Sequence, residues 1–300
     1  MNMTFNKSES EKRINEFQSN FLSMKEDEPN KINIQTNELF ENETRNNMVK
    51  WLSFLCETLN FNLQTLIRSV IIFDKFISSS EICNLDNGQL TQEKLNLITI
   101  ACLSLGTKLE EINCNYVNFF TEKVLNLPNC EIFTVKDLTK MEFTILKELN
   151  FKTLYTTSYD FILFYLEIFK YFFNPNFQFI QNLKNFTENI MKQNINSNIF
   201  LNMTQSDYAF TCLNQAFSQI GLNNIMNQIR NILMIFDINN LVKKNKSLNI
   251  NNNDNENNND DNLHHNLEVN LLSLQSFLNI LNILIKYFTK IFCLYIYIIG

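Results

Sequence analysis

Four ionisable side chains fall on the apolar faces of predicted helices, where a lone charge is costly to bury. Arg45, Asp74, Lys108 and Glu142 each continue a series of apolar residues at helical spacing. The set holds two cations and two anions, so two buried ion pairs are possible, Arg45 with Asp74 and Lys108 with Glu142. The competing interpretation is that each charged residue lies at a helix end and extends its side chain so that the charged group remains in water. Two cations and two anions together favour specific pairs. A charged side chain at the edge of the hydrophobic core is also a group that a partner could recognise.

Helical periodicity predicts the elements that must hold these charges. In the first half of the chain it covers residues 43–59, 63–78, 92–110, 115–126 and a helix that begins near the N-cap candidate Thr134. The segment 92–110 is apolar nearly all round between Leu97 and Leu105, which indicates a helix buried on every side. A second set is predicted over residues 158–173, 177–193, 206–220 and 222–240. Its third member repeats the small residues found in the middle of 92–110, which suggests a repeated all-α domain.

The composition favours this all-α architecture and argues against several classes of function. The chain has 300 residues, of which 45% are hydrophobic, and its scarcity of Gly (4) and Pro (3) disfavours turn-rich β folds. A net charge of −6 suggests no groove for nucleic acid. An enzyme is not expected, because no phosphate loop or dinucleotide-binding glycine motif is present and His264 and His265 fall in a polar, asparagine-rich run.

The seven cysteines contain no CxxC pair, so we expect no metal site and no cofactor. Several of them fall inside apolar helical patterns and are therefore expected to be buried thiols in a reducing compartment. We expect the protein in the nucleus and/or the cytoplasm.

Composition also divides the chain. Residues 1–37 are predicted to form a flexible polar arm and residues 242–266 an asparagine-rich disordered insert. The apolar tail over residues 267–300 has the length of a membrane span. However, Asn279, Asn282, Lys286 and Lys290 interrupt it, so a membrane anchor is disfavoured. The tail could instead supply the final helix of the second set, or its last residues could be translated sequence beyond the true coding end.

Four motifs in the first helical set resemble the cyclin box, in the family's order and at about its spacing. They read TRNNMVKWLSFL (44–55), IIFDKFISS (71–79), LGTKLEE (105–111) and LTKMEFTILKELNF (138–151). The resemblance covers about residues 38–155, which it identifies as an N-terminal cyclin box. It implies a cyclin fold, that is, a five-helix box followed by a degenerate second helical repeat over residues 156–241.

For function, the resemblance implies a regulatory subunit that binds a cyclin-dependent protein kinase. Lys108 and Glu142 match the family's Lys and Glu that hydrogen-bond the kinase backbone. Leu109, Leu146 and Phe151 match apolar positions that receive the kinase αC helix. A cyclin holds that helix in its active position, so activation of the kinase is the expected role.

Other positions match structural and substrate-docking features of the family. Arg45 and Asp74 match the ion pair that ties the first two helices of the box together. A possible substrate-docking patch is matched by Met48, Trp51, Leu95 and Asn96. Thr44 and Asn47 replace apolar residues of that patch, and the chain contains no destruction box, KEN sequence or LxCxE sequence, so the cyclin subtype stays open.

Two alternative functions remain open at this point. A cyclin-fold transcription or scaffold adaptor would bind partners without activating a kinase. A DNA-binding version of that adaptor would predict a basic face and a zinc ribbon, neither of which the sequence contains. A membrane-tethered helical adaptor would depend on the apolar tail.

Overall fold

A computed structural model describes residues 7–29, 42–79, 90–111, 123–127, 130, 132–222 and 224–237. Its helices are α1 (Lys7–Glu26), α2 (Asn42–Thr58), α3 (Leu63–Ile77), α4 (Gln92–Glu110), α6 (Val135–Glu148), α7 (Ser158–Phe173), α8 (Phe177–Asn194), α9 (Asn198–Asn202) and α10 (Gln205–Gln219). A further helix covers residues 224–237. The ranges described contain no strand. Most of the helix predicted over 115–126, the insert over 242–266 and the tail over 267–300 lie outside the described residues.

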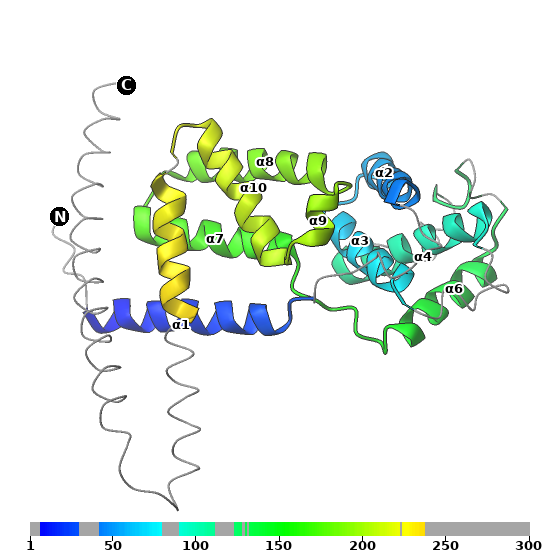
Figure 1. The fold of residues 1–300 in the computed structure, drawn as a ribbon, viewed down its shortest axis with the longest axis horizontal. Coiled ribbons are helices and arrows are strands. Elements are labelled where there is room, and N and C mark those ends of the chain that lie inside the picture. Colours follow the sequence, from blue (N-terminus) through cyan, green and yellow to red (C-terminus); the bar gives the residue numbers. More distant parts are fainter. Residues whose placement is uncertain are drawn as a thin grey trace, which may run out of the picture.

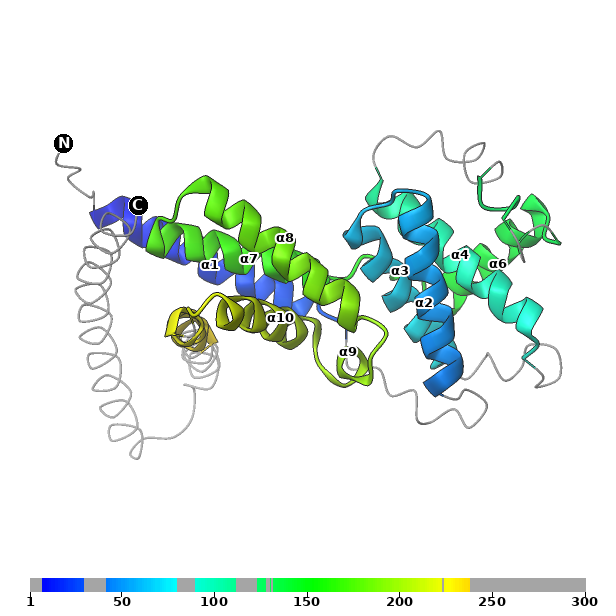
Figure 2. The same ribbon diagram turned by 90° about the horizontal axis from the view of Figure 1, so that it is seen from above.

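The helices form two sets that lie side by side along the long axis of the molecule (Figures 1 and 2). In the first set, α4 packs against α2, α3 and α6. All side chains of α4 from Ile98 to Thr107 are buried, as expected for a helix that is apolar on every side. Gly106 allows α3 and α4 to approach closely, because a Cβ atom there would lie 2.2 Å from Ser69 Oγ and 3.1 Å from the Thr65 carbonyl oxygen. The first set is therefore built around α4.

Local capping explains where several helices begin. Thr134 caps α6 in a capping box, in which its hydroxyl accepts from Asp137 N and the Asp137 carboxylate accepts from Thr134 N. This confirms the predicted start of that helix. Thr157 and Asp160 form the same arrangement at α7. The capping boxes fix the residue at which each helix begins. The start residue in turn fixes which side chains of the helix face the core.

The second set contains α7, α8, α9, α10 and the helix over 224–237. Here α10 packs against α7, α8 and α9. Its small residues Ala209, Cys212 and Ala216 are at most 2% exposed. Small side chains therefore lie at the packed centre of both sets, as the sequence suggested.

The prediction of a flexible arm over residues 1–37 is wrong for Lys7–Glu26, which form α1. This helix lies along α7 (Figure 1). Phe17 and Phe21 are 2% and 4% exposed, and both pack on the ring of Phe164 in α7. Together with Ile14 and Met24 they form a narrow apolar stripe at 3–4–3 spacing. The stripe is thin and the rest of the segment is polar, so composition alone suggested an arm.

No helix within the described ranges is long and apolar enough to cross a membrane.

Candidate functional site

Lys108 and Glu142 form an ion pair across the end of α4. Lys108 Nζ lies 2.7 Å from Glu142 Oε1 and 2.6 Å from Oε2. Ser104, one turn before Lys108, also donates to Oε1. The Glu142 side chain is 9% exposed and that of Lys108 is 40% exposed. The carboxylate is therefore held inside the α4–α6 contact, while the ammonium group stands at the surface within reach of a partner.

Exposed apolar side chains lie on α6 and on the residues that follow it. Phe143 and Phe151 are 58% and 62% exposed, and their rings meet edge to face with centroids 6.4 Å apart. Leu154, in the connector to α7, is 68% exposed. Aromatic side chains with this exposure, next to a fixed ion pair, are typical of a surface that a partner covers. We call Phe143, Phe151 and Leu154 the apolar lip.

The backbone after α6 is what turns Phe151 outward. Asn150 and Phe151 both have left-handed backbones, with φ of 50° and 58°. Phe151 N donates to the Leu146 carbonyl oxygen at 2.7 Å, which closes the end of the helix. A bulky residue in this region is uncommon and costs about 1–3 kcal/mol, so the surrounding structure must impose it.

The predicted apolar positions differ in what they present to solvent. Phe151 is exposed. Leu109 and Leu146 are only partly exposed, because they pack against the core. The sequence interpretation missed Phe143 and Leu154. Phe143 could have been found, because an aromatic residue next to the apolar stripe of an amphipathic helix is unusual at a solvent-facing position.

Arg45 and Asp74 form the predicted pair and are wholly buried. Arg45 Nε and Nη2 donate to the two Asp74 carboxylate oxygens, each at 2.7 Å, and both side chains are 0% exposed. Burial raises the pKa of the Asp74 carboxyl, and the Arg45 guanidinium opposes that shift. Arg45 Nη1 also lies 3.4 Å from the carbonyl oxygen of Asn196, beyond α8. The pair therefore ties α2 to α3 and also reaches the second helical set.

A second buried pair, which the sequence interpretation missed, anchors the connector. Arg68 of α3 donates from Nε to Glu110 Oε1 at 2.6 Å, and the two side chains are 6% and 10% exposed. Its Nη1 also donates to the carbonyl oxygens of Thr153 and Tyr155. Arg68 thus holds the segment that carries Leu154 of the apolar lip. The sequence signal for this pair was the position of Arg68 among the apolar residues of α3.

Glu111, at the C-terminal end of α4, has a structural role of its own. Its carboxylate accepts from Asn62 N at 3.0 Å and from Thr65 Oγ1 at 2.6 Å. It therefore joins the end of α4 to the start of α3. With Lys108 and Glu110, this makes three charged residues in the last turn of α4 and its cap that each have a defined partner.

The possible substrate-docking residues are only partly available at the surface. Met48 and Leu95 are buried, at 7% and 4% exposed, whereas Trp51 and Asn96 are half-buried. Gln92 Nε2 lies 3.9 Å from Met48 Sδ and donates to Asn96 Oδ1 at 2.9 Å, so it brings α2 and α4 together at this point. Any docking surface here would present mainly Trp51 and Asn96.

No group of residues suited to hold a metal ion occurs among the described ones. Cys56, Cys102, Cys130 and Cys212 are buried and unbridged. Burial raises the pKa of Cys56 to about 12 and that of Cys212 to about 11, so these two thiols are protonated at neutral pH.

The sequence of the chain is similar to that of known cyclins. The family model described as "Cyclin, N-terminal domain" matches residues 16–154. The chain is 28% identical over 123 residues to Cyclin-SDS from Arabidopsis thaliana, a match that covers 41% of this chain and 20% of that protein. The chain therefore corresponds to about a fifth of this relative's length.

A solved structure shows the same fold. A viral cyclin from herpesvirus saimiri matches with a TM-score of 0.55 and 18% identity, covering 74% of this chain and 94% of that one. A chain of the yeast RNA Pol II CTD kinase CTDK-1 complex matches more weakly, with a TM-score of 0.47 and 19% identity over 63% of this chain and 60% of that one. The matched domain, the all-helical cyclin fold and the four ordered motifs lead to one conclusion: residues 16–154 are similar to the N-terminal domain of cyclins, and the chain has the cyclin fold.

Proposed function

We propose that the chain is a cyclin-type regulatory subunit that binds a cyclin-dependent protein kinase and activates it by holding the kinase αC helix inward. One observation carries the proposal: the Lys108–Glu142 pair is formed in the free chain and stands beside the exposed apolar lip. A polar pair fixed before binding loses little conformational freedom when a partner docks. The lip would supply most of the buried area.

Each part of the site has a distinct role in this mechanism. The Lys108 ammonium group would hydrogen-bond main-chain carbonyl oxygens of the kinase, and the Glu142 carboxylate would hold that ammonium in place. Phe143, Phe151 and Leu154 would cover the apolar side of the αC helix. Because these contacts exist only when the helix is turned inward, binding shifts the kinase population toward its active conformation. The chain itself would transfer no phosphoryl group.

The test is a pull-down from native extract with the full chain as bait. The wild-type chain is expected to capture a kinase that phosphorylates a general substrate such as histone H1. The Lys108→Ala, Glu142→Ala and double variants are expected to lose at least tenfold of the captured activity, as for the loss of a central charged contact. Lys170→Ala, which removes an exposed lysine of α7 in the second helical set, is the matched control and should leave the activity unchanged.

Circular dichroism on each variant must show an intact fold. Undiminished capture and activation by a folded double variant would contradict the proposal. If wild-type chain captured a kinase without raising its activity, the chain would be an adaptor and the activation step would be wrong.

A further inference from the structure

Three lysines and a phenylalanine form a line along the surface of α6. Lys136, Lys140, Phe143 and Lys147 are four, three and four positions apart, so they share one face of the helix. All four side chains are exposed, because α6 packs against α4 through its opposite, buried face. The line is about 16 Å long, at about 1.5 Å of rise per residue. We call Lys136, Lys140 and Lys147 the basic stripe.

No carboxylate of α6 neutralises the basic stripe. Glu142 points inward and is paired with Lys108. Asp137 accepts two hydrogen bonds from Thr134, which lower its pKa more than the charges of the neighbouring lysines do. Asp137 and Glu148 also lie about a quarter of a turn round the helix from the stripe, at about 100° per residue. None of the three lysines forms an ion pair with any residue that the structure describes.

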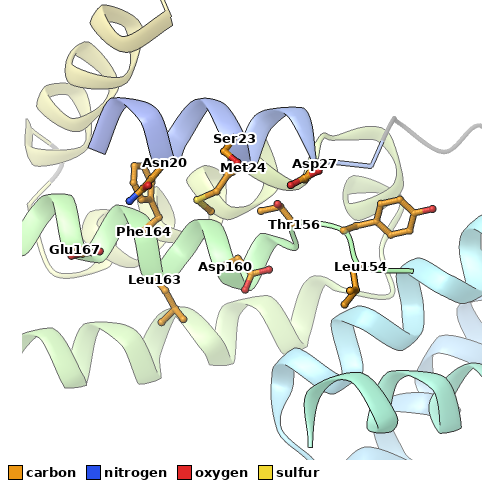
Figure 3. Close-up of a pocket in the computed structure, with 11 residues that line it drawn as sticks. Asn20, Ser23, Met24, Asp27, Leu154, Thr156, Asp160, Leu163, Phe164 and Glu167 are labelled. Atoms are coloured by element: carbon orange, nitrogen blue, oxygen red, sulfur yellow. The ribbon is translucent and has the colours of Figure 1, made fainter. Parts of the chain in front are cut away.

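The positive charge of this surface contrasts with the rest of the chain, whose net charge is −6. At the junction of the two helical sets, for example, Asp27, Asp160 and Glu167 line a groove between α1 and α7 (Figure 3). Only Glu167 of these three acids is paired with a described cation, Arg13. The basic stripe is therefore a local feature of α6 in an acidic protein, and local charge of this kind attracts partners of opposite sign.

The basic stripe also runs beside the apolar lip. Phe143 lies within the line itself, about 4.5 Å after Lys140 and about 6 Å before Lys147 along the helix axis. Its ring meets that of Phe151, and Lys152, the next residue, is exposed as well. A partner that covers the lip must therefore meet lysines on both sides of Phe143. Such a surface is complementary to an apolar partner residue that is flanked by Asp or Glu.

We propose that the basic stripe binds an acidic segment of the kinase that docks on the apolar lip. This inference rests on the proposed function and adds a charge requirement to it. A kinase with carboxylates on both sides of the residue that covers Phe143 associates fast, whereas one with lysines or arginines there is rejected. Charges at the rim of an interface act mainly on the association rate and on its salt dependence. The stripe and the Lys108–Glu142 pair therefore have different kinetic signatures.

The test measures association by surface plasmon resonance between the immobilised full chain and the kinase that it captures, purified from the extract. The Lys136→Glu/Lys147→Glu variant reverses the charge at both ends of the stripe. At about 50 mM salt we expect its association rate constant to be about tenfold lower than that of the wild type, with dissociation changed less than about twofold. Raising the salt to about 500 mM should slow the wild type and narrow the difference.

The matched control is Lys170→Glu/Lys192→Glu, at exposed lysines of α7 and α8 in the second helical set. It changes the net charge of the chain by the same amount and should associate with the kinase within about twofold of the wild-type rate. Circular dichroism must show an intact fold for both variants. The Lys108→Ala/Glu142→Ala chain should instead lose binding mainly through faster dissociation, because it removes a central contact.

The contact is located with a carbodiimide, which joins lysine amines directly to carboxylates. Cross-links between the basic stripe and Asp or Glu residues of the kinase are expected. Cross-links that avoid the stripe would overturn the inference, and so would equal slowing by the stripe and control variants. If the stripe instead bound a nucleic acid or an anionic membrane, its reversal would leave kinase association unchanged. That result would overturn the inference and leave the proposed function intact, whereas a wild-type chain that captures no kinase would contradict both.

Discussion

Replacing Arg68 by methionine removes the buried cation that anchors the connector between the two helical sets. The change would leave the Glu110 carboxylate, 10% exposed, without its ion-pair partner, and the carbonyl oxygens of Thr153 and Tyr155 without a donor from this side chain. Removing one member of a buried pair costs about 3–5 kcal/mol. With a urea slope of about 2 kcal/mol per M, the midpoint of unfolding should fall by about 1.5–2.5 M.

The same variant makes a functional prediction that is separate from stability. Because Arg68 holds residues 153–155, its loss should also loosen the segment that carries Phe151 and Leu154. Under conditions where Arg68→Met is still folded, its capture of kinase from extract should therefore fall.

Two comparisons make the reasoning refutable. The double variant Arg68→Met/Glu110→Met should be more stable than Arg68→Met alone, because no charge is left buried without a partner. Arg13→Met removes an arginine whose side chain is 44% exposed, and it should cost less than about 1 kcal/mol. If Arg68→Met cost no more than Arg13→Met in urea unfolding, or if the double variant were the less stable one, the assigned role of Arg68 would be wrong.

Three further predictions concern other parts of the box. Arg45→Met should lower the free energy of unfolding by about 3–5 kcal/mol, because it leaves a carboxylate buried without its cation, and an unchanged melting temperature would contradict this. Gly106→Ala should cost about 1–3 kcal/mol through the clash with α3, and Ser69→Ala should recover part of that loss in thermal melts. Hydrogen bonds from Thr134 hold the pKa of Asp137 below its ordinary value of 3.8. The stabilisation is therefore present above that value and is lost as the pH falls through the lowered pKa. An NMR titration of Thr134→Ala should show the Asp137 pKa moving upward, and no movement would argue against the capping box.

The sequence by itself determined several of the helices and the two predicted ion pairs. Residues 92–110 and 158–173 were predicted with the bounds that α4 and α7 have, because periodicity and N-caps are local properties of the chain. The Arg45–Asp74 and Lys108–Glu142 pairs followed from charges on apolar stripes, since a buried charge needs a partner of opposite sign.

Only the tertiary structure decided which surfaces are covered and which are left open. The helix α1 is stable because its thin apolar stripe packs on aromatic side chains of α7. Residues 1–37 contain the stripe, but they do not reveal the surface against which it packs. Arg68 meets Glu110 and the connector across 42 to 87 positions of sequence. The exposure of the apolar lip and the groove beside α7 depend on what does not pack there. Local patterns report how a segment can fold, whereas burial and exposure are properties of every segment placed around it.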